Sequence, residues 1–390
     1  MGERRGMNNT HLKNRNRGLV LQLIACEGPL PRVEIARRVG LTKMAVSNIV
    51  SELIAEGYVE ECGTAEASAA VGRSPTLLRI ASGAPGAIGV YLSRDSLSVI
   101  LADMTCRILL KHTVSLAGET RESLTQKLLA AVAQVRQASP IPLLGIGIST
   151  IGPLDAANRL MLKPLRFFGI SHYPIAAILE ESSGLPTYLE NDMNAAALAE
   201  RLYGVGRRLD HFLYIGLSDG VGAGIISGGR LYRDHNGFVG EIGHSSICFD
   251  GPLCGCGNRG CLELYVSIPV ICERLHASGA QSPAPEDFEE LAAQPAFAAI
   301  FRDAAEKLSV AMVNMANLLD PQGIVIGHEG AFLPAFCLRQ MEAAVNQRIL
   351  AAGFQHLSVK RSSFGGDAPL LGSACCVFQE LFRGGLFCIK

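Results

Sequence analysis

The same order of elements occurs twice in the body of this chain. In the first copy, three short apolar runs separated by turn residues precede an amphipathic segment and a further apolar run, at residues 86–92, 96–103, 108–114, 121–137 and 143–149. The second copy has apolar runs, a helical pattern and a final strand pattern at residues 211–217, 222–229, 297–319 and 323–327. Short strands mixed with amphipathic helices predict an α/β fold, and the duplication predicts two lobes around a ligand-binding cleft.

Composition narrows the class of protein. The chain has 390 residues, of which 48% are hydrophobic, so it can bury a large core without staples. No apolar run is as long as a membrane span, and the basic N-terminus has no hydrophobic signal core. We therefore expect a cytoplasmic protein without membrane contact, whose twelve cysteines are mostly reduced thiols with a few metal ligands.

Positive charge is concentrated at the N-terminus. Residues 1–50 contain nine Lys or Arg and three Glu, whereas the whole chain has a net charge of −1. This asymmetry favours a nucleic-acid contact over a basic arm that is merely solvated.

The basic segment has the pattern of a helix-turn-helix. A helix is expected at 15–26 and a short one at 32–39, followed by a turn at Gly40. Thr42 is a good N-cap for a third helix at 43–57. Strand patterns at 58–62 and 76–80 add a hairpin, which makes a winged version.

The two helices of this motif are expected to have different faces. Val33, Ala36 and Val39 are predicted to point inward from the short helix. The third helix leaves polar side chains outside that can reach base edges and phosphates in a major groove, and the candidates are Lys43, Met44, Ser47 and Asn48. Arg73, between the wing strands, is either a minor-groove contact or part of a solvated linker. A three-helix interaction module without DNA is the alternative.

A cysteine-rich stretch lies in the second copy. Cys254 and Cys256 flank one glycine, Cys261 follows five residues later, and His244 precedes them by ten. Three thiolates and one imidazole fill a tetrahedral Zn²⁺ shell and leave no open position, which predicts one structural ion per chain. Free thiols in a glycine-rich loop are the alternative, and Cys248 is a spare thiol nearby.

Polar residues near this stretch suggest a binding pocket. Asn191 and Asp192 stand where a strand pattern meets a helix pattern, so Asp192 is either an N-cap or a residue that faces the cleft. Glu241, His244 and Glu263 adjoin the cysteines. Carboxylates and amides that can each hold a pair of vicinal hydroxyls are typical of a sugar site.

The motifs together resemble those of the ROK family of repressors, open reading frames and kinases. The similar stretches are residues 145–155, 190–204, 220–244 and 251–263. The winged helix-turn-helix in front, joined through residues 71–80, is similar to the repressor branch, which includes xylose and N-acetylglucosamine repressors. The resemblance covers nearly the whole chain and implies an actin-like, ribonuclease-H-like body with two lobes.

The resemblance also implies roles for individual residues. Zn²⁺ would be held by His244, Cys254, Cys256 and Cys261, and sugar hydroxyls by Asn191, Asp192, Glu241, His244 and Glu263. In the family's kinases, the residue that matches Asp192 deprotonates the sugar hydroxyl. The implied domains are a winged helix-turn-helix with linker at 1–80 and a ROK body at 81–390. Within the body, lobe one covers about 84–190 plus the C-terminal helix, and lobe two about 191–365.

The nucleotide side departs from the kinases. Their Asp-x-Gly-Gly-Thr phosphate loop is replaced at residues 89–96, where bulky Tyr91 and Leu92 stand in place of glycine. A second phosphate loop reads Ser218-Asp219-Gly220, and its acid would repel a triphosphate. The strand end at 323–330 also departs from the kinases' glycine-rich adenosine segment.

These observations predict a DNA-binding transcriptional regulator, a repressor of carbohydrate genes, that senses a sugar or sugar derivative and is not an enzyme. Its partners would be a double-stranded operator and further copies of itself, as a dimer or tetramer, because paired readers match palindromic half-sites. One alternative is a ROK sugar kinase that also binds DNA. The other is a regulator controlled by a protein partner, with a vestigial pocket.

Overall fold

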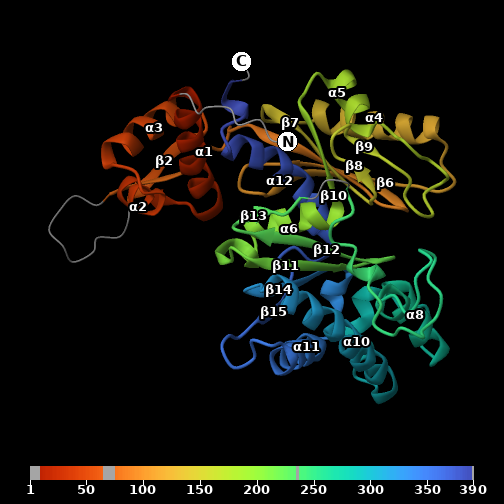
Figure 1. Ribbon diagram of the computed structural model, residues 1–390. Coiled ribbons are helices and arrows are strands. Elements are labelled where there is room, and N and C mark those ends of the chain that lie inside the picture. The colour runs from red at the N-terminus through yellow and green to blue at the C-terminus, as the bar shows by residue number, and fades with distance from the viewer. Residues whose placement is uncertain (1–8, 65–74, 234–236, 389–390) are drawn as a thin grey trace. The chain divides into compact units, whose positions relative to one another are not determined.

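The computed structural model describes residues 9–64, 75–233 and 237–388 (Figure 1). The chain divides into two compact units. The first contains the residues up to Ile148, Tyr173–Leu189 and the residues from Ser373 onward, and the second contains Ser149–His172 and Glu190–Gly372. Arg73 lies outside the described residues. Among the described helices, none combines the length and the apolar character needed to cross a membrane.

The N-terminal part is a winged helix-turn-helix. Its helices and strands are α1 (Asn9–Glu27), α2 (Arg32–Val39), α3 (Lys43–Ala55), β1 (Leu30–Pro31), β2 (Val59–Thr64) and β3 (Thr76–Ile80). The strands form an antiparallel sheet in the order β1-β3-β2. Gly40 closes α2 with φ +69°, and the Thr42 hydroxyl caps α3 by accepting the N–H of Ala45 (3.2 Å). Both the turn and the cap agree with the sequence.

The inward face of α2 differs from the prediction. Ile35 and Ala36 are buried, Val39 is only half-buried, and Val33 is 54% exposed. Apolar residues at four positions of this eight-residue helix allow two different stripes, so spacing alone could not choose between them. The choice is made by packing against α1 and α3.

The first half of the body is built on a five-stranded sheet in the order β10-β7-β4-β5-β6. Its strands are β4 (Gly86–Leu92), β5 (Ser96–Ala102), β6 (Ile108–Ser115), β7 (Leu143–Thr150) and β10 (Thr187–Asn191). The helices of this half are α4 (Arg121–Gln137) and α5 (Ile175–Ser183), and a small hairpin joins β8 (Leu154–Asp155) to β9 (Leu160–Met161). The antiparallel β4-β5-β6 meander confirms the predicted strands.

The second half repeats this plan in the order β13-β12-β11-β14-β15. Its strands are β11 (Phe212–Leu217), β12 (Val221–Ser227), β13 (Arg230–Leu231), β14 (Gly323–His328) and β15 (Ser358–Arg361). The central strands β11 and β14 are parallel, so their last residues, Leu217 and His328, lie side by side at the C-terminal ends of the two strands. The candidate site begins at these strand ends.

Helices cover both faces of the second sheet. The helices of this half are α6 (Asp192–Leu202), α7 (Glu263–Val266), α8 (Ile268–Ala277), α9 (Phe288–Leu291), α10 (Pro295–Leu319) and α11 (Ala335–Arg348). The last helix, α12 (Ala368–Phe382), belongs to the first unit from Ser373 onward. One core lies between the sheet and α10 and α11, and a smaller one contains Met193, Ala196 and Ala197 of α6. Figure 1 shows α10 and α11 packed side by side. The sheet is therefore buried on both faces, and its loops are left to carry the polar residues.

Candidate functional site

The cysteine-rich stretch gathers four metal-ligating side chains. Ligand atoms of His244, Cys254, Cys256 and Cys261 all lie within 4.8 Å of one another. The Sγ atoms of Cys256 and Cys261 are 3.7 Å apart, and Cys254 Sγ is 3.8 Å from His244 Nδ1. A disulfide would need about 2.05 Å, whereas sulfurs on a tetrahedral ion are about 3.8 Å apart. The spacing therefore suits four ligands around one metal ion.

Backbone geometry brings these side chains together. The N–H of Cys254 donates to the carbonyl of Asn258 (2.8 Å), which closes a tight loop over the intervening residues. Gly260 has φ +63°, and a Cβ there would lie 1.7 Å from the carbonyl oxygen of Cys248. Glycine is required at this position because any side chain would collide with backbone.

The three thiols of this cluster differ in acidity. Burial raises the pKa of Cys254 to about 12 and also raises that of Cys261. The backbone N–H of Asn258 lowers the pKa of Cys256. A bound divalent cation would reverse the effect of burial, because ligation requires the thiolate. Cys248 Sγ contacts Asp250 (3.1 Å), and this thiol is not among the four clustered ligands.

Asn191 and Asp192 take different positions at the start of α6. Asn191 is the N-cap, and its side-chain oxygen accepts the N–H groups of Met193 (3.0 Å) and Asn194 (3.4 Å). Asp192 is the first helical residue, is 5% exposed, and accepts the N–H of Met193 (2.9 Å). The cap is therefore Asn191, and the second carboxylate oxygen of Asp192 is left for another partner.

Glu241 is near the other candidate acids. It precedes the short 3-10 helix η2 (Ile242–His244), and part of its side chain is exposed. Loss of solvation raises the pKa of its carboxyl, His244 lowers it, and the charges of Asp192 and Glu263 raise it further. Within the described part of the chain, no hydrogen bond is made to the Glu241 carboxylate. This group is therefore available to a ligand.

Glu263 links the acids to the cysteine cluster. Its Oε1 accepts from Cys254 Sγ (3.1 Å) and lies 3.4 Å from His244 Nδ1. A Cβ added at Gly220 would lie 3.6 Å from its other oxygen, and one added at Gly152 would lie 3.3 Å from Asn191 Nδ2 and 4.0 Å from Glu241 Oε1. The five predicted sugar residues thus belong to one neighbourhood of the second unit, lined by small residues. Its carboxylates can accept from hydroxyls and disfavour phosphate.

The turn that matches a kinase phosphate loop is closed on itself. Leu92 is fully buried and pairs with Leu97. In the turn, the Ser93 hydroxyl bonds with Asp95 (2.7 Å) and Ser96 (2.8 Å), and the Ser96 N–H donates to Ser93 Oγ (3.1 Å). Its polar groups are therefore used within the turn, in agreement with the loss of the glycine pattern.

The outer face of α3 is the candidate nucleic-acid surface. Lys43, Met44 and Asn48 are exposed and Ser47 is half-buried, while Val46, Ile49, Val50 and Leu53 form the buried face. Among the described residues, the side chains of Lys43 and Asn48 make no hydrogen bond or ion pair. The face is free to contact a ligand.

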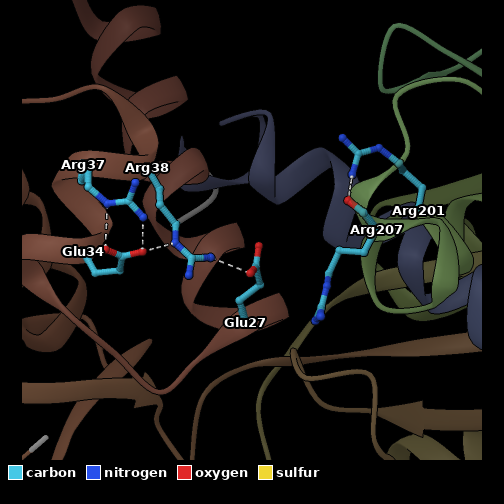
Figure 2. Close-up of polar contacts among 6 residues, drawn as sticks. All are labelled: Glu27, Glu34, Arg37, Arg38, Arg201 and Arg207. Carbon is cyan, nitrogen blue, oxygen red and sulfur yellow. Dashed lines mark hydrogen bonds and ion pairs between the residues drawn. The ribbon is translucent and has the colours of Figure 1, made fainter.

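The arginines of α2 are held by glutamates instead. Figure 2 shows Glu34 between Arg37 and Arg38, with contacts of 2.6 and 2.5 Å, and Arg38 also bonded to Glu27 at 2.6 Å. The two guanidinium groups lower the pKa of the Glu34 carboxyl to about 2. In the second unit, the same figure shows Arg201 donating to the carbonyl of Arg207 (2.9 Å). These arginines stabilise local structure.

One residue of the site was missed from the sequence. His328, at the end of β14, is 2% exposed, and its Nε2 lies 3.7 Å from Asp192 Oδ2. The departure of this strand end from a glycine-rich segment was visible in the sequence. Nothing in the spacing showed that the new side chain turns toward Asp192, because the two residues are far apart along the chain.

Comparison with known proteins agrees with this architecture. Residues 87–380 match the ROK family, and residues 13–60 match a winged helix-turn-helix DNA-binding family. A xylose repressor of Caldicellulosiruptor bescii is 30% identical over 395 residues, 96% of this chain and 98% of its own.

Two similar solved structures match different shares of this chain. A ROK family transcriptional regulator, a homologue of the Escherichia coli MLC protein, superposes with a TM-score of 0.80 at 25% identity, over 96% of this chain and 98% of its own. A ROK hexokinase of Thermus thermophilus gives 0.65 at 28% identity, over 76% of this chain and 98% of its own. The regulator is matched over a larger share of this chain than the kinase.

Proposed function

This chain belongs to the ROK family, and from that premise we propose that it is a transcriptional repressor of carbohydrate genes whose body binds a sugar effector. The observation that carries this proposal is the combination of the polar face of α3 with the carboxylate of Glu241 in the body, to which no described residue donates a hydrogen bond. A xylose repressor and a ROK family transcriptional regulator, each similar over nearly the whole chain, support this proposal.

We propose Zn²⁺ as the ion at His244, Cys254, Cys256 and Cys261. Soft thiolates with one imidazole favour Zn²⁺ over hard cations, and four protein ligands leave no position for a reactive water. The ion would fix the loop that carries His244 and the start of α7, where Glu263 stands. Its role is structural, at one ion per chain.

The effector is proposed to be a neutral sugar or sugar derivative. Asn191, Asp192, Glu241, His244 and Glu263 supply oxygen and nitrogen atoms that can each bond a hydroxyl. Three carboxylates in one neighbourhood repel a phosphorylated ligand, so the uncharged form is favoured. Lys43, Met44, Ser47 and Asn48 are the proposed DNA-contacting residues, with Arg73 as a further candidate.

Self-association is part of the proposal. One reader contacts a short half-site, and two readers related by symmetry match a palindromic operator with half-sites about one helical turn apart. We propose a dimer or tetramer, within which the sugar shifts the balance between DNA-competent and DNA-incompetent states. The size of that shift is limited by the difference in sugar affinity between the states.

The test uses an operator duplex selected in vitro from a random library. Its affinity is measured by gel shift against D-xylose, D-glucose and N-acetyl-D-glucosamine, and metal content and mass in solution are measured on the same sample. We expect one zinc per chain, an oligomer and a sugar that changes DNA affinity. Sugar-dependent ATP consumption would favour the kinase alternative, and no effect of any sugar would remove effector sensing.

A further inference from the structure

His328 occupies a backbone conformation that its residue type rarely adopts. Its φ is +52° and its ψ is −144°, a region populated mainly by glycine. The residue at this position is nevertheless a histidine, and it is buried, with 2% of its surface exposed. Such strain is unfavourable and persists only where the surroundings hold the residue in place. A histidine at this point therefore needs a reason beyond the course of the chain.

Tyr214 fixes the orientation of the imidazole. Its hydroxyl lies 3.0 Å from His328 Nδ1 and accepts the backbone N–H of His328 (2.9 Å). Burial raises the pKa of Tyr214 well above its ordinary value, so the hydroxyl keeps its proton. Among the described residues, the only acceptor for that proton is Nδ1. When Nδ1 accepts a hydrogen bond, the proton of a neutral imidazole is on Nε2.

That nitrogen faces Asp192. Nε2 makes no hydrogen bond among the described residues and lies 3.7 Å from Asp192 Oδ2, slightly beyond hydrogen-bond length. Asp192 Oδ1 already accepts the N–H of Met193. The donor of His328 and the remaining oxygen of Asp192 therefore face each other in a buried space, and a shift of about 1 Å would join them.

We propose that His328 is a positioning residue of the effector site: held by Tyr214, it presents its Nε2–H to Asp192 and orients that carboxylate for a sugar hydroxyl. The inference rests on the proposed function for its effector, and on the geometry alone for the Tyr214–His328–Asp192 chain. A ligand that draws Asp192 into place would close the 3.7 Å gap to a hydrogen bond. Supporting donors of this kind set the direction of the lone pairs that a ligand meets.

A purely structural role would leave different traces. A residue kept only to fill space is replaced by an apolar side chain of similar volume at little cost. Here the imidazole carries a buried, unsatisfied polar atom in a strained backbone, and both features are unfavourable without a partner for Nε2. Asp192 Oδ2, at 3.7 Å, can supply one.

The first test needs no ligand. Nitrogen-15 NMR of the histidine side chains at pH 8 reports which ring nitrogen is protonated, and the His328 signals are assigned by their loss in His328→Gln. We expect a proton on Nε2 in the full-length protein, and a weaker tautomer preference in Tyr214→Phe. An unprotonated Nε2 with a protonated Nδ1 would overturn the inference.

The second test measures binding by calorimetry with D-xylose, D-glucose and N-acetyl-D-glucosamine. His328→Leu removes the donor, His328→Gly removes the ring but suits the backbone, and His328→Gln keeps an N–H donor. For the sugar that binds, we expect about a tenfold or greater loss in the first two and partial rescue in the third. His356→Leu, at an exposed histidine, is the matched control and should bind normally.

The outcomes separate the two proposals. If all three His328 variants bind the sugar as tightly as the unsubstituted protein, the positioning role is overturned while sugar sensing stands. If the unsubstituted protein binds none of the three sugars, sugar sensing fails and the NMR result alone decides the Tyr214–His328–Asp192 chain. In the Asp192→Asn background, His328→Leu should have little further effect on sugar affinity, since the two groups act as a pair. Additive effects would count against the pairing.

Discussion

The turn at residues 93–96 and the acids around Glu241 are both rich in polar groups, but they use them differently. In the turn, Ser93, Asp95 and Ser96 bond with one another. Around Glu241, loss of solvation and neighbouring charges raise the pKa of a carboxyl that has no hydrogen-bond donor within the described residues. The first arrangement stabilises the chain, whereas the second leaves capacity for a ligand.

The winged helix-turn-helix shows the same contrast between its adjacent helices α2 and α3. Arg37 and Arg38 of α2 are bonded to Glu34 and Glu27 (Figure 2), whereas Lys43 and Asn48 of α3 are exposed. Positive charge in the sequence alone does not identify a DNA contact, because much of it is neutralised locally. Substitutions of residues that are hydrogen-bonded within the protein should change stability. Substitutions of exposed residues without such partners should change ligand binding.

The largest effect on stability is expected from the cluster of three cysteines and one histidine. Cys261→Ser removes one of four clustered side chains, so the protein should lose the proposed Zn²⁺ and about 3–5 kcal/mol of unfolding free energy. Cys248→Ser is the matched control, because this neighbouring thiol lies outside the cluster, and it should keep the metal. Metal analysis and thermal unfolding give the readout. Full metal content in the Cys261 variant would remove this residue from the site.

At Glu241, whose carboxylate is the proposed acceptor for a sugar hydroxyl, Glu241→Gln should weaken sugar binding about 10- to 100-fold, because a charged acceptor is lost. Asp219→Asn, at the loop that would face a nucleotide, should change sugar affinity by less than about twofold. Calorimetry with the sugar that binds measures both. A larger loss in Asp219→Asn than in Glu241→Gln would contradict the placement of Glu241 in the sugar site.

On α3, Asn48→Ala should cost about 1–3 kcal/mol against the selected operator and relax its sequence preference. Lys43→Ala should weaken selected and random duplexes alike and reduce the salt dependence of binding. Fluorescence anisotropy over a salt series distinguishes these behaviours. Reversed behaviours would mean that α3 lies in the groove in another orientation.

The smallest effect is expected at Glu34. Its pKa is about 2 in the folded protein against an ordinary 4.5, because Arg37 and Arg38 favour the charged form. The stabilisation is therefore complete above about pH 4.5 and is lost as the pH falls toward 2. Glu34→Gln should unfold earlier than the unsubstituted protein at pH 7 and at the same temperature near pH 2. A difference that does not change with pH would contradict the assignment.

Local patterns predicted the elements well. The meander at 86–115, the helix at 121–137 and the cap at Thr42 follow from apolar periodicity and turn residues, and the structure has them there. The spacing of His244, Cys254, Cys256 and Cys261 predicted that these side chains cluster, as they do. What failed depended on tertiary packing: the buried face of α2 was set by its neighbours, and His328 meets Asp192 only because β14 pairs in parallel with β11. Sequence separation hides such pairs.

The central claim is that sugar binding and DNA binding are coupled in one molecule, and thermodynamic linkage tests it most directly. Sugar affinity is measured with and without the selected operator, and operator affinity with and without the sugar. We predict that both change by the same factor, typically 5- to 150-fold, because the coupling free energy is reciprocal. A sugar that binds free and operator-bound protein equally well would contradict the account.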